Sequence, residues 1–83
     1  MIAMTNKNGK SVRLSADFNL DTETVYYKVY CDGVTFEFKD FAPAASMYKS
    51  FSDRIEHGTY SENFLRNRVS AAAVFGYKVT EAK

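Results

Sequence analysis

Residues 24–39 read TVYYKVYCDGVTFEFK, and they predict a β-hairpin. Apolar and polar residues alternate on both sides of Asp32-Gly33, a dipeptide that favours a type I′ turn because both turn positions need a positive φ angle. A two-residue turn fixes the register, so Cys31 should face Val34. Seven residues are then expected to point to the core: Val25, Tyr27, Val29, Cys31, Val34, Phe36 and Phe38.

A second alternating segment runs from Ser11 to Phe18 and predicts another strand. Its apolar side carries four residues: Val12, Leu14, Ala16 and Phe18. Residues 19–23 are polar and have the length of a hairpin loop, so this strand should pair antiparallel with the strand that follows. The segment 1–10 is either a flexible start or contains a short strand at 2–4 that folds back.

After Lys39 the apolar spacing changes to three and four residues, which predicts an amphipathic helix. Asp40 or Ala42 is expected to cap this helix, and Gly58 to end it in the left-handed conformation. The apolar stripe that should cover the sheet consists of five residues: Ala44, Met47, Tyr48, Phe51 and Ile55. Lys49 and Asp53 fall off the stripe and should face solvent.

The last third of the chain is ambiguous between helix and strand. Thr59 and Glu62 have capping-box spacing, which predicts a short helix near 60–72. The β-branched and aromatic run 74–80 favours a closing strand, while the alanines before it favour a helix. Residues 69–80 therefore remain open to both assignments.

These elements predict one small α+β domain over residues 1–83. Its sheet should be antiparallel with three to four strands, in the order β-β-β-α-α with a final β left open, and its helices should pack on one face. The charge is nearly balanced, with 11 Lys and Arg against 10 Asp and Glu. This balance argues against a strongly basic nucleic-acid binder and against an acidic DNA mimic.

No residue set with catalytic or metal-binding spacing stands out. Cys31 is the one cysteine and His57 the one histidine, so a Cys/His metal site lacks ligands, and Cys31 is expected to be a buried apolar residue. The glycines are scattered and form no phosphate loop. We therefore expect no enzyme, no cofactor and no metal. A cytoplasmic setting is expected, because no signal-peptide pattern or membrane span is visible.

The candidate site is the polar side of the predicted sheet. It carries six residues: Arg13, Tyr26, Lys28, Tyr30, Glu37 and Lys39. Tyrosine and arginine are enriched in protein interfaces, and tyrosines among basic residues also suit single-stranded nucleic acid. An ordinary strand surface with a Lys28–Glu37 cross-strand pair explains the same pattern. A second, locally basic patch consists of Asn63, Arg66 and Arg68, for which a solvated helix face is the competing interpretation.

The architecture resembles that of small proteins encoded by phages and mobile elements. Among these are anti-CRISPR proteins, one group of which has a three-stranded antiparallel sheet followed by helices. The resemblance covers residues 11–75 and rests on the alternating strand at 12–15, the turn at Asp32-Gly33, and the helix stripe with Tyr48 and Phe51. Those inhibitors are strongly acidic and imitate DNA, whereas this chain is balanced, so that mechanism is not carried over.

The resemblance implies a non-enzymatic inhibitor that blocks a host defence nucleoprotein through a protein surface, in the cytoplasm of the host cell. Its partner would be a protein or nucleoprotein complex, with no membrane involved, and the chain would be a monomer or a homodimer. The alternative is a small nucleic-acid-binding or regulatory domain that uses the Tyr/Lys/Arg face of the sheet.

Overall fold

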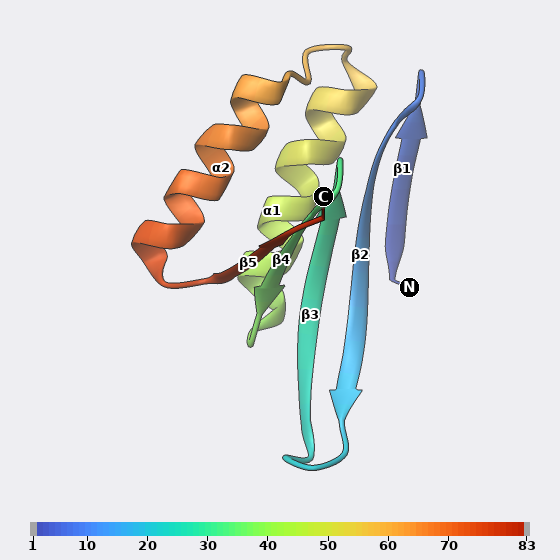
Figure 1. Cartoon of the computed structure of the whole chain (residues 1–83). Helices are drawn as coiled ribbons and strands as arrows, with labels where there is room; N and C mark the ends of the chain where they lie inside the picture. Colours follow the sequence, from blue (N-terminus) through green and yellow to red (C-terminus); the bar gives the residue numbers. More distant parts are fainter. Residues whose placement is uncertain (1, 83) are drawn as a thin grey trace.

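The computed structural model describes residues 2–82, which form an open five-stranded antiparallel sheet with two helices on one face (Figure 1). The strands lie side by side in sequence order, and both helices fall between the fourth and fifth strands. The elements are β1 (Ala3–Lys7), β2 (Lys10–Asn19), β3 (Thr24–Cys31), β4 (Val34–Phe38), α1 (Phe41–Glu56), α2 (Glu62–Phe75) and β5 (Lys78–Glu81). The α+β class and the antiparallel sheet agree with the sequence-based expectation.

The β3–β4 hairpin has the predicted register. Cys31 faces Val34, and the pairing continues in step to Tyr27 and Phe38. Asp32 has a φ angle of 52° and the following glycine one of 80°, the positive values that a type I′ turn needs. The alternation of side chains on the two strands therefore follows directly from the turn.

The sheet has five strands, more than the three to four expected, in part because residues 3–7 form a strand of their own. This strand pairs antiparallel with β2, so the fold-back alternative for the N-terminal segment is correct for the part described, and Met1 lies outside the described residues. Thr5 Oγ1 lies 2.8 Å from the Tyr48 hydroxyl and 2.6 Å from the Ser52 hydroxyl on α1. Hydrogen bonds to α1 thus help to hold a strand that has few apolar residues.

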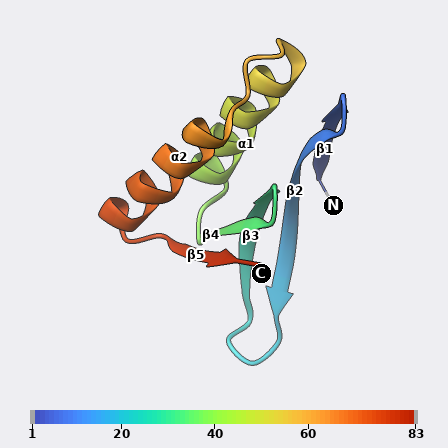
Figure 2. The same ribbon diagram turned by 45° about the horizontal axis from the view of Figure 1, so that its top comes forward.

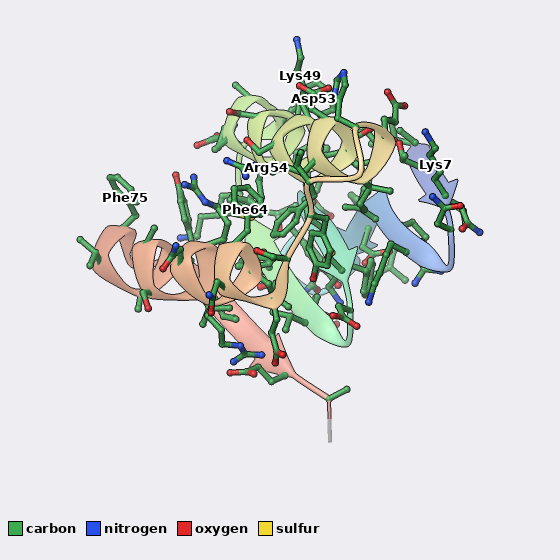
Figure 3. All side chains as sticks on the ribbon, turned by 90° about the horizontal axis from the view of Figure 1, so that it is seen from above. Lys7, Lys49, Asp53, Arg54, Phe64 and Phe75 are labelled. Carbon is green, nitrogen blue, oxygen red and sulfur yellow. The ribbon has the colours of Figure 1, made fainter. Side chains whose placement is uncertain are left out.

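Helix α1 follows its predicted stripe. Its N-cap is Asp40, whose side chain makes no capping hydrogen bond, and Gly58 follows its last turn with a φ angle of 71°. The stripe is buried at Phe51 and Ile55 and packs against the sheet along its length. Lys49 and Asp53 are exposed and point away from the sheet (Figure 3).

Helix α2 starts later than predicted. Its N-cap is Ser61, whose hydroxyl accepts a hydrogen bond of 3.3 Å from the Phe64 N–H, so the expected cap at Thr59 is wrong. Thr59 instead donates its backbone N–H to the Arg54 carbonyl at 2.8 Å. It is thereby used to close α1, and the next residue with a suitable hydroxyl takes the capping role.

The ambiguous segment contains both a helix and a strand. Helix α2 continues to Phe75, beyond the predicted end near residue 72, and Gly76 stops it with a φ angle of 78°. The strand is therefore Lys78–Glu81 and not 74–80. The alanine-rich part keeps the helical conformation until a residue that tolerates positive φ is reached. The returning chain then pairs antiparallel with β4.

One face of the sheet, the inner face, packs against the helices (Figure 2). The opposite, outer face carries no helix. The buried hydrophobic residues of this core come from three strands and both helices: Val12, Leu14, Val29, Cys31, Val34, Phe36, Phe38, Ala44, Phe51, Ile55, Leu65 and Ala72. A single core thus joins the sheet and both helices.

The β2–β3 hairpin extends past the helices, and its far part, residues 15–26, is called here the hairpin arm (Figure 1). Tyr27 meets Phe41, the first residue of α1, at a ring-centroid distance of 5.4 Å, which marks where the helical cover ends. Beyond that point the inner face is open, so Phe18 is 55% and Val25 47% exposed. The prediction that Val25 points to the core is therefore wrong, and Ala16 and Phe18 on the apolar side of β2 are exposed as well.

A pair of phenylalanine substitutions tests this division of the inner face. Phe36→Ala removes a side chain with 0% exposure and should lower the free energy of unfolding by about 3–5 kcal/mol. Phe18→Ala removes the same atoms from the arm and should cost less than about 1 kcal/mol. Urea unfolding of both variants measures the difference, and equal losses would show that the arm is covered in solution.

Candidate partner-binding surface

Five of the six residues proposed for the site lie on the strands of the outer face. Strand β2 contributes Arg13, β3 contributes Tyr26, Lys28 and Tyr30, and β4 contributes Glu37. Successive side chains on a strand point to opposite faces, and the intervening residues Val29 and Phe36 are buried on the inner face. Lys39 directly follows the end of β4, and continued alternation from Glu37 places it on the outer face as well.

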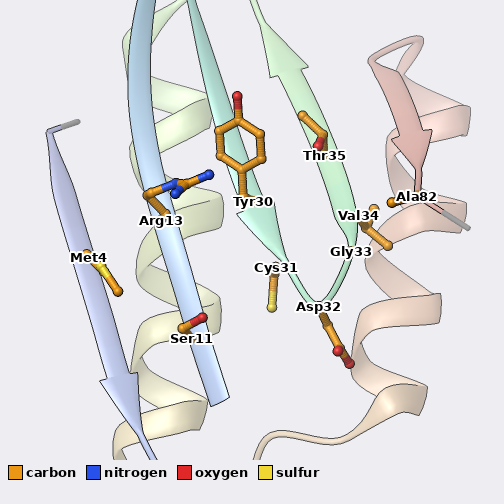
Figure 4. Close-up of a pocket in the computed structure, with 10 residues that line it drawn as sticks. All are labelled: Met4, Ser11, Arg13, Tyr30, Cys31, Asp32, Gly33, Val34, Thr35 and Ala82. Atoms are coloured by element: carbon orange, nitrogen blue, oxygen red, sulfur yellow. The ribbon is translucent and has the colours of Figure 1, made fainter. Parts of the chain in front are cut away.

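A row of opposed residues crosses all five strands at Arg13. Met4, Arg13 and Tyr30 are opposed in turn on β1, β2 and β3, and the row continues through Thr35 to Thr80. The Arg13 guanidinium lies 4.5 Å from the centroid of the Tyr30 ring, within cation–π range. Met4, Arg13, Tyr30 and Thr35 of this row border a hollow of about 350 Å³ that reaches the Asp32-Gly33 turn (Figure 4).

The neighbouring part of the outer face is charged. Lys28 Nζ lies 3.7 Å from Asp17 Oδ2 and 5.3 Å from the centroid of the Tyr26 ring. Partial burial alone lowers the pKa of Lys28, but the neighbouring hydroxyls of Tyr30 and Tyr26, followed by the carboxylates Asp17 and Glu37, outweigh burial and raise it. The ammonium group is therefore firmly charged at neutral pH.

A groove of about 550 Å³ lies where the hairpin arm leaves the rest of the sheet. It is lined by Tyr26, Glu37, Lys39 and Lys78, together with Asn19, Thr24 and Val25. The structure thus places three of the proposed residues at this groove, and Arg13 and Tyr30 at the hollow on the other side of Lys28. Lys78 was not among the proposed outer-face residues, because its place beside Glu37 depends on β5 pairing with β4.

The arginines of the second basic patch contact different parts of the structure. Arg66 Nη1 donates to Glu81 Oε1 at 2.7 Å, and this contact with β5 raises the pKa of Arg66. The Arg68 guanidinium instead packs against the Phe64 ring at 5.1 Å. Arg54 of α1 reaches the same ring at 4.4 Å (Figure 3). Asn63 is exposed on α2, so the three proposed residues do not form one cluster.

Cys31 is buried, as expected, and its thiol is protected from ionisation. It is 3% exposed, and burial raises its pKa from 9.0 to about 11. Sequence reasoning missed its neighbour Tyr60, whose hydroxyl donates to Asp32 Oδ2 at 3.2 Å and whose pKa is also raised by burial. Because a thiolate is the reactive form of cysteine, this environment suits packing and not nucleophilic chemistry.

Within residues 2–82, no three His, Cys, Asp or Glu side chains are grouped so that they could hold a metal ion. His57 caps the end of α1, where its Nδ1 lies 2.7 Å from the Asp53 carbonyl oxygen. Over the same residues, no helix combines the length and the apolar character required to cross a membrane.

The fold and the surface define a small α+β protein with an antiparallel sheet that is covered on one face and bare on the other. Comparisons with models of protein families, with curated protein sequences and with solved structures give no match. Function is therefore inferred from the chemistry of the exposed surfaces.

The environment of Cys31 predicts how stability depends on pH. The unfolded thiol ionises near pH 9, whereas the folded thiol stays protonated until about pH 11. Its contribution to the free energy of unfolding is thus complete below pH 9 and is lost as the pH rises to about 11. Urea unfolding across this range should show a steeper decline for the wild type than for Cys31→Val.

The Cys31→Val variant is the matched control, because it keeps a buried apolar side chain and leaves the Tyr60 hydroxyl in place. If the free energy of unfolding falls equally with pH in the two proteins, the raised pKa of Cys31 is contradicted. Thiol-specific reagents give a second measurement, since they should modify native Cys31 only when the protein unfolds.

Proposed function

We propose that this protein is a small, non-enzymatic binding protein that docks onto another protein through its outer face. The observation that supports the proposal best is the packed Arg13–Tyr30 pair on a sheet face that no helix covers. Both residues lie on paired strands, so their backbone is already ordered before a partner binds.

The chemistry of the outer face suits a protein partner. Tyrosine and arginine are the residue types that most often carry binding energy in protein interfaces. The hollow beside Tyr30 and the groove beside Tyr26 offer two places for partner side chains. A standard interface takes about 800 Å² from each partner, roughly one seventh of the 5497 Å² surface of this chain.

A nucleic-acid partner has less support. Asp17 and Glu37 lie among the lysines of the outer face and would repel phosphates. Arg13 lies within cation–π range of Tyr30, and Lys28 of Tyr26, so stacking a base on these rings would compete with contacts already made. The mixed charge of the outer face and the contacts already made by its tyrosine rings favour a folded protein as the partner.

In its most concrete form, the proposal is an inhibitor of the phage type that covers a surface of a host defence nucleoprotein. Its support is the architectural resemblance together with a face that could block a partner sterically. The near-balanced charge supports contact with the protein part of such a complex, because an acidic DNA mimic would need many more carboxylates.

Alanine substitution of Tyr26 and Tyr30 together tests the outer face. We expect the double variant to lose more than about 2 kcal/mol of binding energy, roughly thirtyfold in Kd. The partner is first captured from bacterial lysate on the tagged wild-type protein, with and without nuclease, and its affinity for each variant is then measured.

Lys49→Ala and Asp53→Ala provide the control, because both residues are exposed on α1 on the side away from the sheet. They should bind as the wild type does. Unchanged binding by a folded Tyr26/Tyr30 double variant would show that the partner does not bind through these residues of the outer face. Captured nucleic acid that disappears with nuclease, with an affinity that falls steeply with salt, would favour the nucleic-acid alternative.

A further inference from the structure

The side of β2 that faces away from β3 is only partly covered. Strand β1 pairs with Lys10–Leu14, and within residues 2–82 no strand continues this pairing along residues 15–19. The uncovered side of residues 15–19, called here the β2 edge, belongs to the hairpin arm that projects past the helices (Figure 1; Figure 2).

The backbone of the β2 edge has N–H and C=O groups that could hydrogen-bond to an added strand. The Ile2 N–H donates to the Leu14 carbonyl at 2.8 Å, so the polar groups of Leu14 point to the β1 side. In an antiparallel strand these directions alternate from residue to residue, which places the N–H and C=O groups of Ala16 and Phe18 on that same side. An added strand could therefore form up to about four hydrogen bonds there.

The inner side of the arm is apolar and exposed. Phe18 and Val25 face each other across β2 and β3, and Leu20 in the turn is 80% exposed. Phe41, at the start of α1, is 48% exposed and continues this apolar surface towards the helices. An added strand would place alternate side chains beside Phe18.

The arm is also acidic. Residues 15–26 contain Asp17, Asp21 and Glu23 and no lysine or arginine, which gives a net charge of −3 in a chain whose total is +1. Asp17 is on the outer side of the β2 edge, where it pairs with Lys28 at 3.7 Å with its side chain 41% exposed. A strand added here would place its outward-pointing residues next to a carboxylate.

From the open backbone, the apolar side and the negative charge, we propose that the β2 edge binds an extended segment of another protein that alternates basic and apolar residues. Its apolar residues pack beside Phe18, and its basic residues lie beside Asp17. This site goes beyond the outer face and does not depend on it.

A second copy of the chain fits the β2 edge less well. Two arms placed side by side would bring together two segments of charge −3, and a symmetric antiparallel pairing centred on Asp17 would set this residue opposite its own copy. The outer strands β1 and β5 are 5 and 4 residues long, and short edge strands are less prone to pairing. The charge of the arm thus selects a basic partner.

Amide hydrogen exchange of the full chain, followed by NMR, tests the proposal without any substitution. The probe is a seven-residue peptide that alternates Lys and Val, acetylated and amidated at its ends. In the free protein the Ala16 and Phe18 amides should exchange fast, and saturating peptide should slow them at least about tenfold. The Ser15 and Asp17 amides point to β3 and provide the internal control.

Charge is tested with a second peptide and two variants. A peptide with Glu in place of Lys should bind at least about tenfold more weakly. Asp17→Lys should weaken binding of the Lys/Val peptide by a similar factor, whereas Asp53→Lys on α1 should leave it unchanged. Tyr30→Ala should also bind this peptide normally, so the two proposals can fail separately.

Three results would overturn the proposal. The first is a Lys/Val peptide that leaves the Ala16 and Phe18 amides unprotected at millimolar concentration. The second is equal binding of the Glu and Lys peptides. The third is protection of these amides in the free protein together with the mass of a dimer, which would assign the β2 edge to a second copy.

Discussion

The packing of Phe51 is the contact on which the rest of this structure depends. This side chain has no exposed surface, and its ring lies 5.9 Å from that of Phe36 on β4 and 5.3 Å from that of Phe64 on α2. It therefore joins the sheet, α1 and α2 at one point. A chain of 83 residues can bury only about 60–65% of its unfolded surface, so few other contacts can share this role.

A core of this size covers only part of the sheet. Helix α1 begins at Phe41, level with Tyr27 of β3, and both helices lie on the inner face. The outer face and the hairpin arm are thus left bare for the same reason. The two surfaces differ in charge, because the outer face mixes Arg13 and lysines with Asp17 and Glu37, whereas residues 15–26 of the arm contain three carboxylates and no lysine or arginine.

The parts of the fold that could be predicted are those fixed by local chemistry. The Asp32-Gly33 turn sets the register of β3 and β4, and this register in turn places Tyr26 and Tyr30 on the outer face. The sequence left open whether the N-terminal segment forms a strand, because Thr5 of β1 is held by α1 residues 43 and 47 positions away, which no local pattern encodes.

The exposure of the arm escaped prediction for a similar reason. Alternation shows which face Phe18 and Val25 share, but it carries no information on where the covering helix begins. The basic patch divides because Arg66 bonds to Glu81 of β5, a contact that depends on tertiary packing, whereas Arg68 packs on Phe64 four residues earlier on the same helix. Local sequence patterns thus predicted the residues of the candidate face, but not the tertiary contacts around it.

The connection that leads to β5 is much longer than the turns between the first four strands. The turns that join β1 to β4 contain two, four and two residues, whereas 39 residues (39–77) separate β4 from β5. Closing short loops costs less entropy, so the first four strands can pair early in folding and β5 joins late. A chain made from its N-terminus therefore passes through a stage in which β4, with Val34 and Phe36, is an unprotected edge strand. Association between nascent chains is most favoured in that interval, before β5 has been synthesised and paired with β4.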